Sequence, residues 1–271
     1  MVKRRSLTGL VWMLLVAVGL QWLAACSSTG EGKYDETRDW SAERLYTEAK
    51  EELLSGDYKK AASYYEKLAA RYPYGRYAQQ AQLELAYAYY RDKEPAQALA
   101  TADRFIKLYP DHPNVDYAYY LKGLVNFNED LGVFGGIANQ DMSERDPRGA
   151  RESFEAFREL VTRFPDSRYA SDAYARMRYL VNAMANNEVR VATYYLRRQA
   201  FVGAVNRAQS VLVNYPKTPA VEQALIVLVE AYNAMGLTEL RDDSQRMLKL
   251  NFPKTKYSLA NPYGKKWYQF W

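Results

Sequence analysis

Residues 76–110 read RYAQQAQLELAYAYYRDKEPAQALATADRFIKLYP, and the two halves of this stretch have the pattern of two packed helices. The first half contains Leu85-Ala86-x-x-Tyr89, and the second places Ala98 and Ala102 ahead of Tyr109-Pro110. Two helices approach closely only where a small side chain faces a large one. Proline ends a helix because it lacks the N–H that the backbone hydrogen bonds require. The stretch therefore predicts a helix–turn–helix unit that ends at the proline.

The same unit recurs along the chain. Aromatic-proline pairs occur at Tyr72-Pro73, Tyr109-Pro110, Phe164-Pro165, Tyr215-Pro216 and Phe252-Pro253. The positions twelve residues before these prolines are small in four cases out of five: Ala61, Ala98, Ser153, Ala204 and Arg241. This is the A-x3-F…P half of the tetratricopeptide (TPR) pattern, a helix–turn–helix of about 34 residues. We predict an all-α fold of five TPR-like repeats that form a solenoid, with a deviating terminal repeat.

The spacings between the prolines are 37, 55, 51 and 37 residues, so two repeats are longer than the others. The longer second spacing predicts a Gly-rich insert loop at 129–147, between an amino-terminal half at 40–128 and a carboxy-terminal half at 148–253. The longer third spacing falls in 169–199, which contains neither Pro nor Gly and predicts one long helix. Four polar residues lie near expected helix starts: Asp57, Asp111, Asp166 and Ser171. Their side-chain oxygens could cap the free N–H groups there.

The amino terminus has the pattern of a signal peptide at 1–25. Basic residues at 3–5 precede an apolar run from Leu10 to Leu20, which is too short for a comfortable membrane helix of about 20 residues. The run closes with Leu23-Ala24-Ala25-Cys26, which resembles the bacterial lipobox, in which the Cys is lipidated and becomes the first residue. The alternative is an ordinary secretory cleavage site that happens to precede a Cys. Ser27 is not the Asp that retains enteric lipoproteins at the inner membrane. We therefore expect a lipid anchor on Cys26, a flexible tether at 26–39, and a location on the periplasmic face of the outer membrane.

Composition excludes several function classes. Cys26 is the one cysteine, so the folded part forms no internal disulfide. Without the three basic residues of the signal the formal charge falls from +5 to +2, which removes the electrostatic argument for nucleic-acid binding. His112 is the one histidine and lies between Asp111 and Pro113, typical of a turn. We predict no metal, no cofactor and no enzyme activity. A carboxylate pair for glycoside hydrolysis stays open on the sequence, although solvated helix surfaces explain the many acids more simply.

Two sets of residues are candidates for binding a partner. Tyr46, Lys50, Tyr87 and Tyr90 fall on first-helix faces that should line a concave groove, where they suit either capture of an extended peptide or plain packing. The stretch from Val189 to Lys217 contains five basic residues and no acid. Its Arg190, Tyr194 and Arg197 share one helical face, which indicates either an acidic partner or a solvated surface.

Four segments together resemble one family. They are Arg71–Tyr90, His112-Pro-Asn-Val-Asp-Tyr117, Arg145-Asp-Pro-Arg-Gly-Ala-Arg151 and Val205-Asn206-Arg207. Across about 40–252 the chain is similar to the BamD family, called ComL in Neisseria, which are lipoproteins of the outer-membrane β-barrel assembly machinery.

The resemblance implies a scaffold that works with BamA and with BamC- and BamE-type lipoproteins. Unfolded barrel precursors, whose terminal strand ends in an aromatic residue, would be received by the amino-terminal repeats. The POTRA domain of BamA nearest the barrel would bind the carboxy-terminal half, with Asn206 and Arg207 of the Val-Asn-Arg segment as contacts. Arg197 joins them as a candidate because it belongs to the basic stretch. The alternative is a periplasmic TPR adaptor for Tol–Pal or cell-wall machinery.

The segment 254–271 lies outside this resemblance. Its end, KKWYQFW at 265–271, would expose a sizeable apolar surface if left free. Three fates are open: a cap on the last repeat, a contact with lipid headgroups, or a mimic of the aromatic-ended precursor. We expect the cap, because a terminal repeat otherwise leaves an apolar flank open to water.

Overall fold

The computed structural model describes residues 35–128 and 147–259. The chain divides into two units, 1–41 and 42–271. The described part of the first unit contains a turn in which Asp35 Oδ1 accepts hydrogen bonds from the N–H and the hydroxyl of Thr37, at 3.2 and 2.8 Å. All helices of the described residues belong to the second unit.

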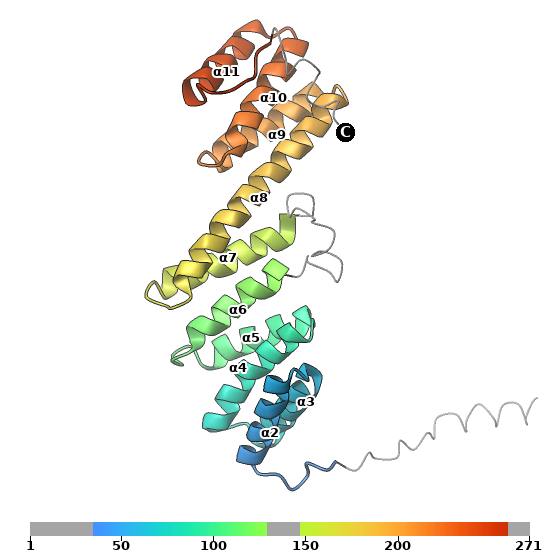
Figure 1. The fold of residues 1–271 in the computed structure, drawn as a ribbon, viewed down its shortest axis with the longest axis vertical. Helices are drawn as coiled ribbons and strands as arrows, with labels where there is room; N and C mark the ends of the chain where they lie inside the picture. Colours follow the sequence, from blue (N-terminus) through green and yellow to red (C-terminus); the bar gives the residue numbers. More distant parts are fainter. Residues whose placement is uncertain (1–34, 129–146, 260–271) are drawn as a thin grey trace, which may run out of the picture. The chain divides into compact units, whose positions relative to one another are not determined.

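The second unit consists of helix pairs that follow one another along the chain (Figure 1). The five pairs are α2 (Ala42–Ser55) with α3 (Tyr58–Arg71), α4 (Arg76–Arg91) with α5 (Pro95–Leu108), α6 (Val115–Asn128) with α7 (Pro147–Arg163), α8 (Ala170–Arg197) with α9 (Phe201–Asn214), and α10 (Ala220–Ala234) with α11 (Thr238–Asn251). No strand occurs in the described ranges. The prediction of an all-α chain of five TPR-like repeats is confirmed.

The small-and-large pattern of the sequence forms the core. Ala61 and Tyr65 of α3 are both fully buried. The small residues at the place of Ala61 in the next three repeats are fully buried too, and so is Phe157, which has the place of Tyr65 in the third repeat. Each helix packs against the next one in the chain, so the small side chain sits where neighbours approach most closely. In the last repeat the corresponding Arg241 and Gln245 are only half-buried. The predicted deviation of the terminal repeat is therefore present.

The aromatic residue before each proline ends the second helix of its repeat in the same way. Its N–H donates to the carbonyl four residues earlier at 2.8–2.9 Å, in Tyr72, Tyr109, Phe164, Tyr215 and Phe252. The following proline has no N–H to extend this ladder. The helix ends there in all five repeats.

A left-handed residue joins the two helices in four of the repeats. It lies 17 residues before the proline in each case, and the φ values are 90° at Gly56, 62° at Lys93, 60° at Gln199 and 73° at Gly236. Glycine adopts this conformation without strain, whereas Lys93 and Gln199 hold it at a steric cost. The tight antiparallel pairing of the two helices is maintained in either case.

The long helix predicted for 169–199 is present as α8, which has 28 residues. Its first half packs with α6 and α7, through Leu180 and Met184, and its second half belongs to the core of the last two repeats, through Val189 and Leu196. One helix thus takes part in both hydrophobic cores. The predicted insert at 129–147 lies outside the described residues except for Pro147, which begins α7.

Helix starts follow the sequence only in part. Asp57 caps α3, accepting the N–H of Lys60 at 3.0 Å. Asp111 and Asp166 lie in the turns before α6 and α8, and Ser171 lies inside α8, so the expectation of a cap was wrong for Ser171. Tyr169 occupies that capping position without a side-chain hydrogen bond.

The described start of the carboxy-terminal segment folds back on α10. Tyr257 is buried, and its hydroxyl donates to Glu230 Oε1 at 2.7 Å. Leu259 packs against the same core. Residues 260–271 lie outside the described part of the chain, so the cap formed by the aromatic end stays a prediction.

Candidate peptide-binding groove and basic strip

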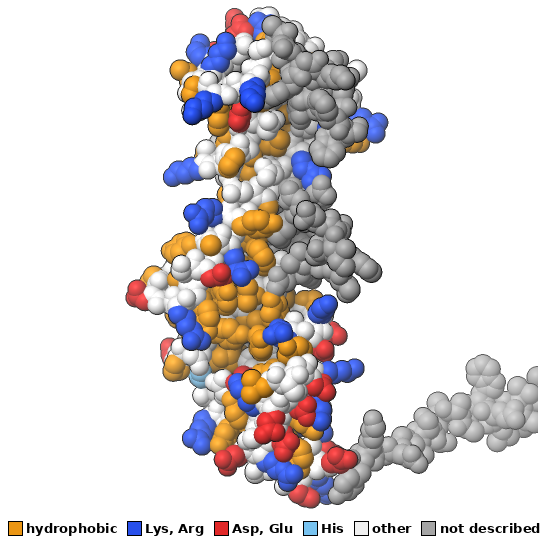
Figure 2. All heavy atoms as spheres, in the orientation of Figure 1, with side chains coloured by type: hydrophobic (Ala, Val, Ile, Leu, Met, Phe, Trp, Pro, Cys, Tyr) orange, Lys and Arg blue, Asp and Glu red, His pale blue; other side chains and the backbone are white. Residues whose placement is uncertain are grey.

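A cavity of about 520 Å³, which we call the groove, lies on the side formed by the first helices of the repeats. Its walls come from α2 and α4, from the first turns of α3 and α6, and from the segments that lead into α6 and α8. Of the residues predicted to line a groove, Lys50 and Tyr87 lie on this cavity. Figure 2 shows hydrophobic side chains gathered around α6 on the face in view, and acidic side chains around α2 and α3.

Glu84 organises one wall of the cavity and is the residue that sequence reasoning missed. Its Oε1 accepts from Lys50 Nζ at 2.6 Å, Gln80 Nε2 at 2.9 Å and the hydroxyl of Tyr46 at 3.1 Å. Its Oε2 accepts from the buried hydroxyl of Tyr65 at 2.5 Å. Glu84 is only 8% exposed, and these donors satisfy its charge. The sequence does contain a sign of this role, because Glu84 is the one charged residue between Arg76 and Arg91 on an otherwise apolar and neutral helix.

Tyr46 supports this wall and is not among the residues that line the cavity. Its ring packs against Tyr77 at 5.4 Å and Tyr65 at 6.1 Å between centroids. Burial, followed by the neighbouring Glu84 carboxylate, raises the pKa of the Tyr46 hydroxyl well above its ordinary value. Tyr46 therefore remains a neutral hydrogen-bond donor to Glu84.

Arg91 forms part of the same wall through contacts with tyrosines. Its guanidinium lies 4.6 Å from the ring centroid of Tyr58 and 5.7 Å from that of Tyr87, and Nη1 donates to the Tyr87 hydroxyl at 2.6 Å. Tyr90 packs behind Tyr87, with ring centroids 6.3 Å apart. Tyr90 faces the cluster around Ala98 and Ala102 and does not line the cavity. The four predicted groove residues thus divide into two at the cavity and two behind it.

The opposite wall consists of Tyr117 on α6 and of Arg168 and Tyr169 ahead of α8. The Tyr117 and Tyr169 rings lie 5.4 Å apart, and Tyr169 stacks on Tyr120 at 4.7 Å. The Arg168 guanidinium lies 4.8 Å from the centroid of the Tyr169 ring and donates to its hydroxyl at 2.5 Å. Aromatic faces and guanidinium groups therefore line both sides of the cavity.

Charge in the cavity is unevenly compensated. Among the described residues that line it, Glu84 is the one acid, and Lys50, Arg91 and Arg168 are basic. Because Lys50 is paired with Glu84, the two arginines carry the excess positive charge. An anionic group with an aromatic neighbour fits such a site.

The stretch from Val189 to Lys217, which we call the basic strip, lies mainly on the carboxy-terminal half of α8 and on α9. Arg190, Tyr194 and Arg197 are all exposed, and the Arg198 guanidinium lies 5.4 Å from the Tyr194 ring centroid. Arg207 is exposed on α9, and Nη1 pairs with Glu188 Oε2 at 3.1 Å.

Asn206 is exposed beside Arg207. Glu188 stands one residue before the acid-free stretch in sequence, and the fold brings it against Arg207. The strip is therefore not free of acid in space.

His112 occupies a turn. Its Nδ1 accepts the N–H of Asn114 at 3.1 Å, and its ring meets Phe105 edge-on at 5.1 Å.

Within the described ranges, no group of three or more His, Cys, Asp or Glu side chains is placed to hold a metal ion. In the same ranges, no helix has the length and apolar character needed to cross a bilayer. Cys26 lies outside the described residues, and its lipidation stays a prediction.

Comparison with known proteins agrees with the architecture. Residues 38–247 match the family model YfiO, described as outer membrane lipoprotein. The chain is 47% identical to the outer membrane protein assembly factor BamD of Neisseria meningitidis serogroup A, over 96% of this chain and 98% of the relative. It is 36% identical to BamD of Vibrio cholerae, over 92% and 99% of the two chains, and 31% identical to BamD of Pasteurella multocida, over 95% and 96%. The chain belongs to the YfiO family of outer membrane lipoproteins, which includes the BamD proteins.

Proposed function

We propose that this protein is a non-enzymatic scaffold of the outer-membrane β-barrel assembly machinery. It binds unfolded barrel precursors in the groove and BamA through the basic strip. Family membership supports the general role, since its relatives are named outer membrane protein assembly factors. A lipid on Cys26 would hold the scaffold at the membrane, with BamC- and BamE-type lipoproteins as further partners.

The observation that carries the precursor-binding role is the pairing of arginines with tyrosine faces across the cavity. Arg91 lies against Tyr58 and Tyr87, and Arg168 lies against Tyr169. A chain that ends in an aromatic residue presents a ring and a carboxylate close together. The ring stacks on tyrosine faces, and the carboxylate accepts charge-assisted hydrogen bonds from a guanidinium. Lys50 has a smaller part, because Glu84 already neutralises it.

The basic strip supports the BamA-binding role. Arg207, Asn206 and Arg197 are all exposed. Asn206 and Arg207 belong to the Val-Asn-Arg segment that resembles the family's contact with BamA, and Arg197 belongs to the same basic strip. An acidic group of the partner would share the guanidinium of Arg207 with Glu188. A guanidinium has five N–H donors, so it can pair with two carboxylates, and Glu188, whose side chain is only 16% exposed, keeps its counter-ion.

The groove is tested with a synthetic peptide of the last ten or so residues of a barrel protein, as the free acid and as the terminal amide. We expect the amide to bind at least about tenfold more weakly, because a hydrogen bond to a charged group contributes about 1.5–3 kcal/mol. Arg168→Gln should weaken the free acid and remove its advantage over the amide. Arg104→Gln, which changes an exposed arginine that does not line the groove, is the matched control. Equal affinity of acid and amide for the wild-type protein would contradict the assignment.

The place of the scaffold is tested by co-purification of the intact lipoprotein from membranes. BamA among the partners supports the proposal. Pal or peptidoglycan enzymes in its place would favour the Tol–Pal or cell-wall adaptor.

A further inference from the structure

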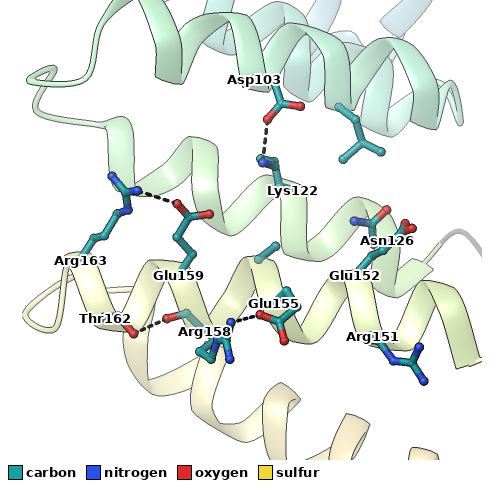
Figure 3. Close-up of a pocket in the computed structure, with 12 residues that line it drawn as sticks. Asp103, Lys122, Asn126, Arg151, Glu152, Glu155, Arg158, Glu159, Thr162 and Arg163 are labelled. Carbon is teal, nitrogen blue, oxygen red and sulfur yellow. Dashed lines mark hydrogen bonds and ion pairs between the residues drawn. The ribbon is translucent and has the colours of Figure 1, made fainter.

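A second cavity, of about 780 Å³, lies between α5, α6 and α7 (Figure 3). It shares no lining residue with the groove described above, because its walls come mainly from the second helices of two successive repeats. Leu99 of α5 and Ala156 of α7 supply apolar surface, and Lys122 and Asn126 of α6 lie between them. Most of the other lining side chains are acidic or basic residues of α7, among them Arg151 and Glu152.

One of the residues that line this cavity has an unsatisfied polar group. Asn126 is only 6% exposed, and its Oδ1 is the one buried side-chain oxygen or nitrogen of the described residues that has no hydrogen-bond partner. An acceptor left unpaired in a buried position costs about 1–3 kcal/mol. The side chain lines the cavity together with Glu152 of the facing helix (Figure 3). A ligand that brings a donor to this oxygen would remove the cost.

The repeats themselves show what is missing at Asn126. Tyr89 and Tyr232 stand 21 residues before the prolines of the second and fifth repeats, and Asn126 has this place in the third repeat once residues 129–146 are left out. The hydroxyl of Tyr89 donates to Glu66 on α3, and the hydroxyl of Tyr232 accepts from Gln209 on α9 at 2.9 Å. In both repeats a tyrosine bridges to the second helix of the preceding repeat.

The second repeat also offers this partner position to the third repeat. Glu66, Asp103 and Gln209 each stand seven residues before the proline of their own repeat. Asp103 instead pairs with Lys122 at 2.6 Å, and Lys122 occupies the place that Leu85 and Leu228 have in the second and fifth repeats. The shorter Asn126 leaves unfilled the space that a tyrosine ring takes elsewhere. The corresponding cavity beside Tyr89 measures only about 390 Å³.

We infer that the cavity between α5, α6 and α7 is a docking pocket for a tyrosine side chain of a partner polypeptide. The ring lies between Leu99 and Ala156. The Asn126 amide, whose Oδ1 is covered in the unbound protein, turns toward the ring, and Oδ1 then accepts from the phenolic hydroxyl. A tyrosine fits because it combines an aromatic body with a donor at its tip. The charged residues of α7 that line the cavity suit the polar backbone and side chains on either side of an inserted residue. They would not favour an isolated apolar molecule.

The full-length protein in detergent is titrated with N-acetyltyrosinamide and N-acetylphenylalaninamide, and binding is followed by saturation-transfer NMR. The two probes differ only in the hydroxyl. We expect the tyrosine probe to bind about three- to tenfold more tightly, as one neutral hydrogen bond provides. Equal affinities for the wild-type protein would overturn the proposal.

Two variants test the position of the contact. Asn126→Leu keeps a side chain of similar size without the acceptor, and should remove the preference for tyrosine. Asn126→Tyr should fill the cavity and abolish binding of both probes; if circular dichroism shows that it does not fold, Asn126→Leu decides alone. Asn233→Leu, which changes an exposed asparagine of α10, should leave both affinities unchanged. A tyrosine preference that survives in Asn126→Leu would refute the pocket.

Discussion

Lys50 Nζ lies 2.6 Å from Glu84 Oε1, so the cation nearest one end of the groove is neutralised by a carboxylate of the neighbouring helix. The pair joins α2 to α4 across adjacent repeats. The Lys50 side chain is 39% exposed and that of Glu84 is 11% exposed, so the acid is the buried member. Its first role is to hold the groove wall together.

Glu84→Ala should therefore destabilise the protein. Removal of the carboxylate leaves the buried Tyr65 hydroxyl without its acceptor, which costs about 1–3 kcal/mol of unfolding free energy. Urea unfolding followed by circular dichroism measures the change. Glu66→Ala removes the acceptor of a more exposed tyrosine, Tyr89, and should cost less. If the two variants lose the same stability, Glu84 does not have the proposed role.

Arg207→Glu should weaken co-purification with BamA while the protein stays folded. Truncation of one partner of a buried interfacial charge pair costs about 2–5 kcal/mol, and a charge reversal should cost at least as much. Helical circular dichroism should be retained. Melting should fall only modestly, because the new carboxylate would repel Glu188, whose side chain is 16% exposed, from a position that is half-exposed. Unchanged co-purification would remove Arg207 from the interface.

Glu188→Gln is the matched partner of that variant. It releases Arg207 from its internal counter-ion and retains the guanidinium, so binding to BamA should be kept or strengthened. A loss as large as that of Arg207→Glu would mean that the internal pair, rather than the free guanidinium, forms the recognised surface.

Asp172 should contribute a stability that disappears in acid. Burial alone would raise the pKa of its carboxyl, but hydrogen bonds from Tyr120 and Arg176, with the charge of Arg176, outweigh burial and hold that pKa below its ordinary value. Because the pKa of Asp172 is lower in the folded state, its carboxylate stabilises the fold at pH values above its unfolded pKa of about 3.9. This stabilisation is lost as the pH falls through the pKa of the folded state.

Asp172→Asn should therefore lose less stability than the wild type between pH 5 and pH 2. The carboxylate is half-exposed, so we expect a difference below about 1 kcal/mol. Urea midpoints at both pH values measure it. Tyr120→Phe, which removes one of the donors, should give an intermediate pH dependence; identical slopes in all three proteins would contradict the linkage.

Gly123→Ala should destabilise the third repeat. A Cβ at Gly123 would lie 2.3–2.7 Å from ring atoms of Phe157, which is fully buried, so neither helix has room to move apart without cost. Overpacking of this kind typically costs about 1–3 kcal/mol. Gly203→Ala is the control, because its Cβ would meet Tyr195 at an ordinary 3.4 Å and alanine favours the helix by about 1 kcal/mol. Thermal melts should move in opposite directions, and a shared direction would show that close packing at Gly123 is not limiting.

Cys26 should carry lipid in the mature protein. The motif Leu23-Ala24-Ala25-Cys26 predicts cleavage before Cys26 and acylation of that residue. Mass spectrometry of the amino-terminal peptide from membrane-extracted protein measures both. An unmodified Cys26, or a mature chain that begins elsewhere, would leave the ordinary secretory interpretation.

The sequence by itself determined the number of repeats and where they end. An aromatic-proline pair and a small residue twelve positions earlier are local requirements of a closely packed helix pair, so they recur whatever the neighbouring repeat contains. The absence of Pro and Gly from 169–199 likewise determined α8. These features depend on backbone geometry within one helix pair, and that geometry can be recognised from short-range sequence patterns.

Only the tertiary structure decided which polar groups meet. Glu84 lies 34 residues from Lys50 and Glu188 lies 19 residues from Arg207, and no helical periodicity relates residues on different helices. The same holds for Tyr46 and Tyr90, which share the predicted face with Lys50 and Tyr87 yet lie behind the cavity wall. The packing of first helices against each other sets these distances. Whether a side chain lines the groove or supports it from behind depends on the helix that faces it. The sequence pattern of its own helix does not contain that information.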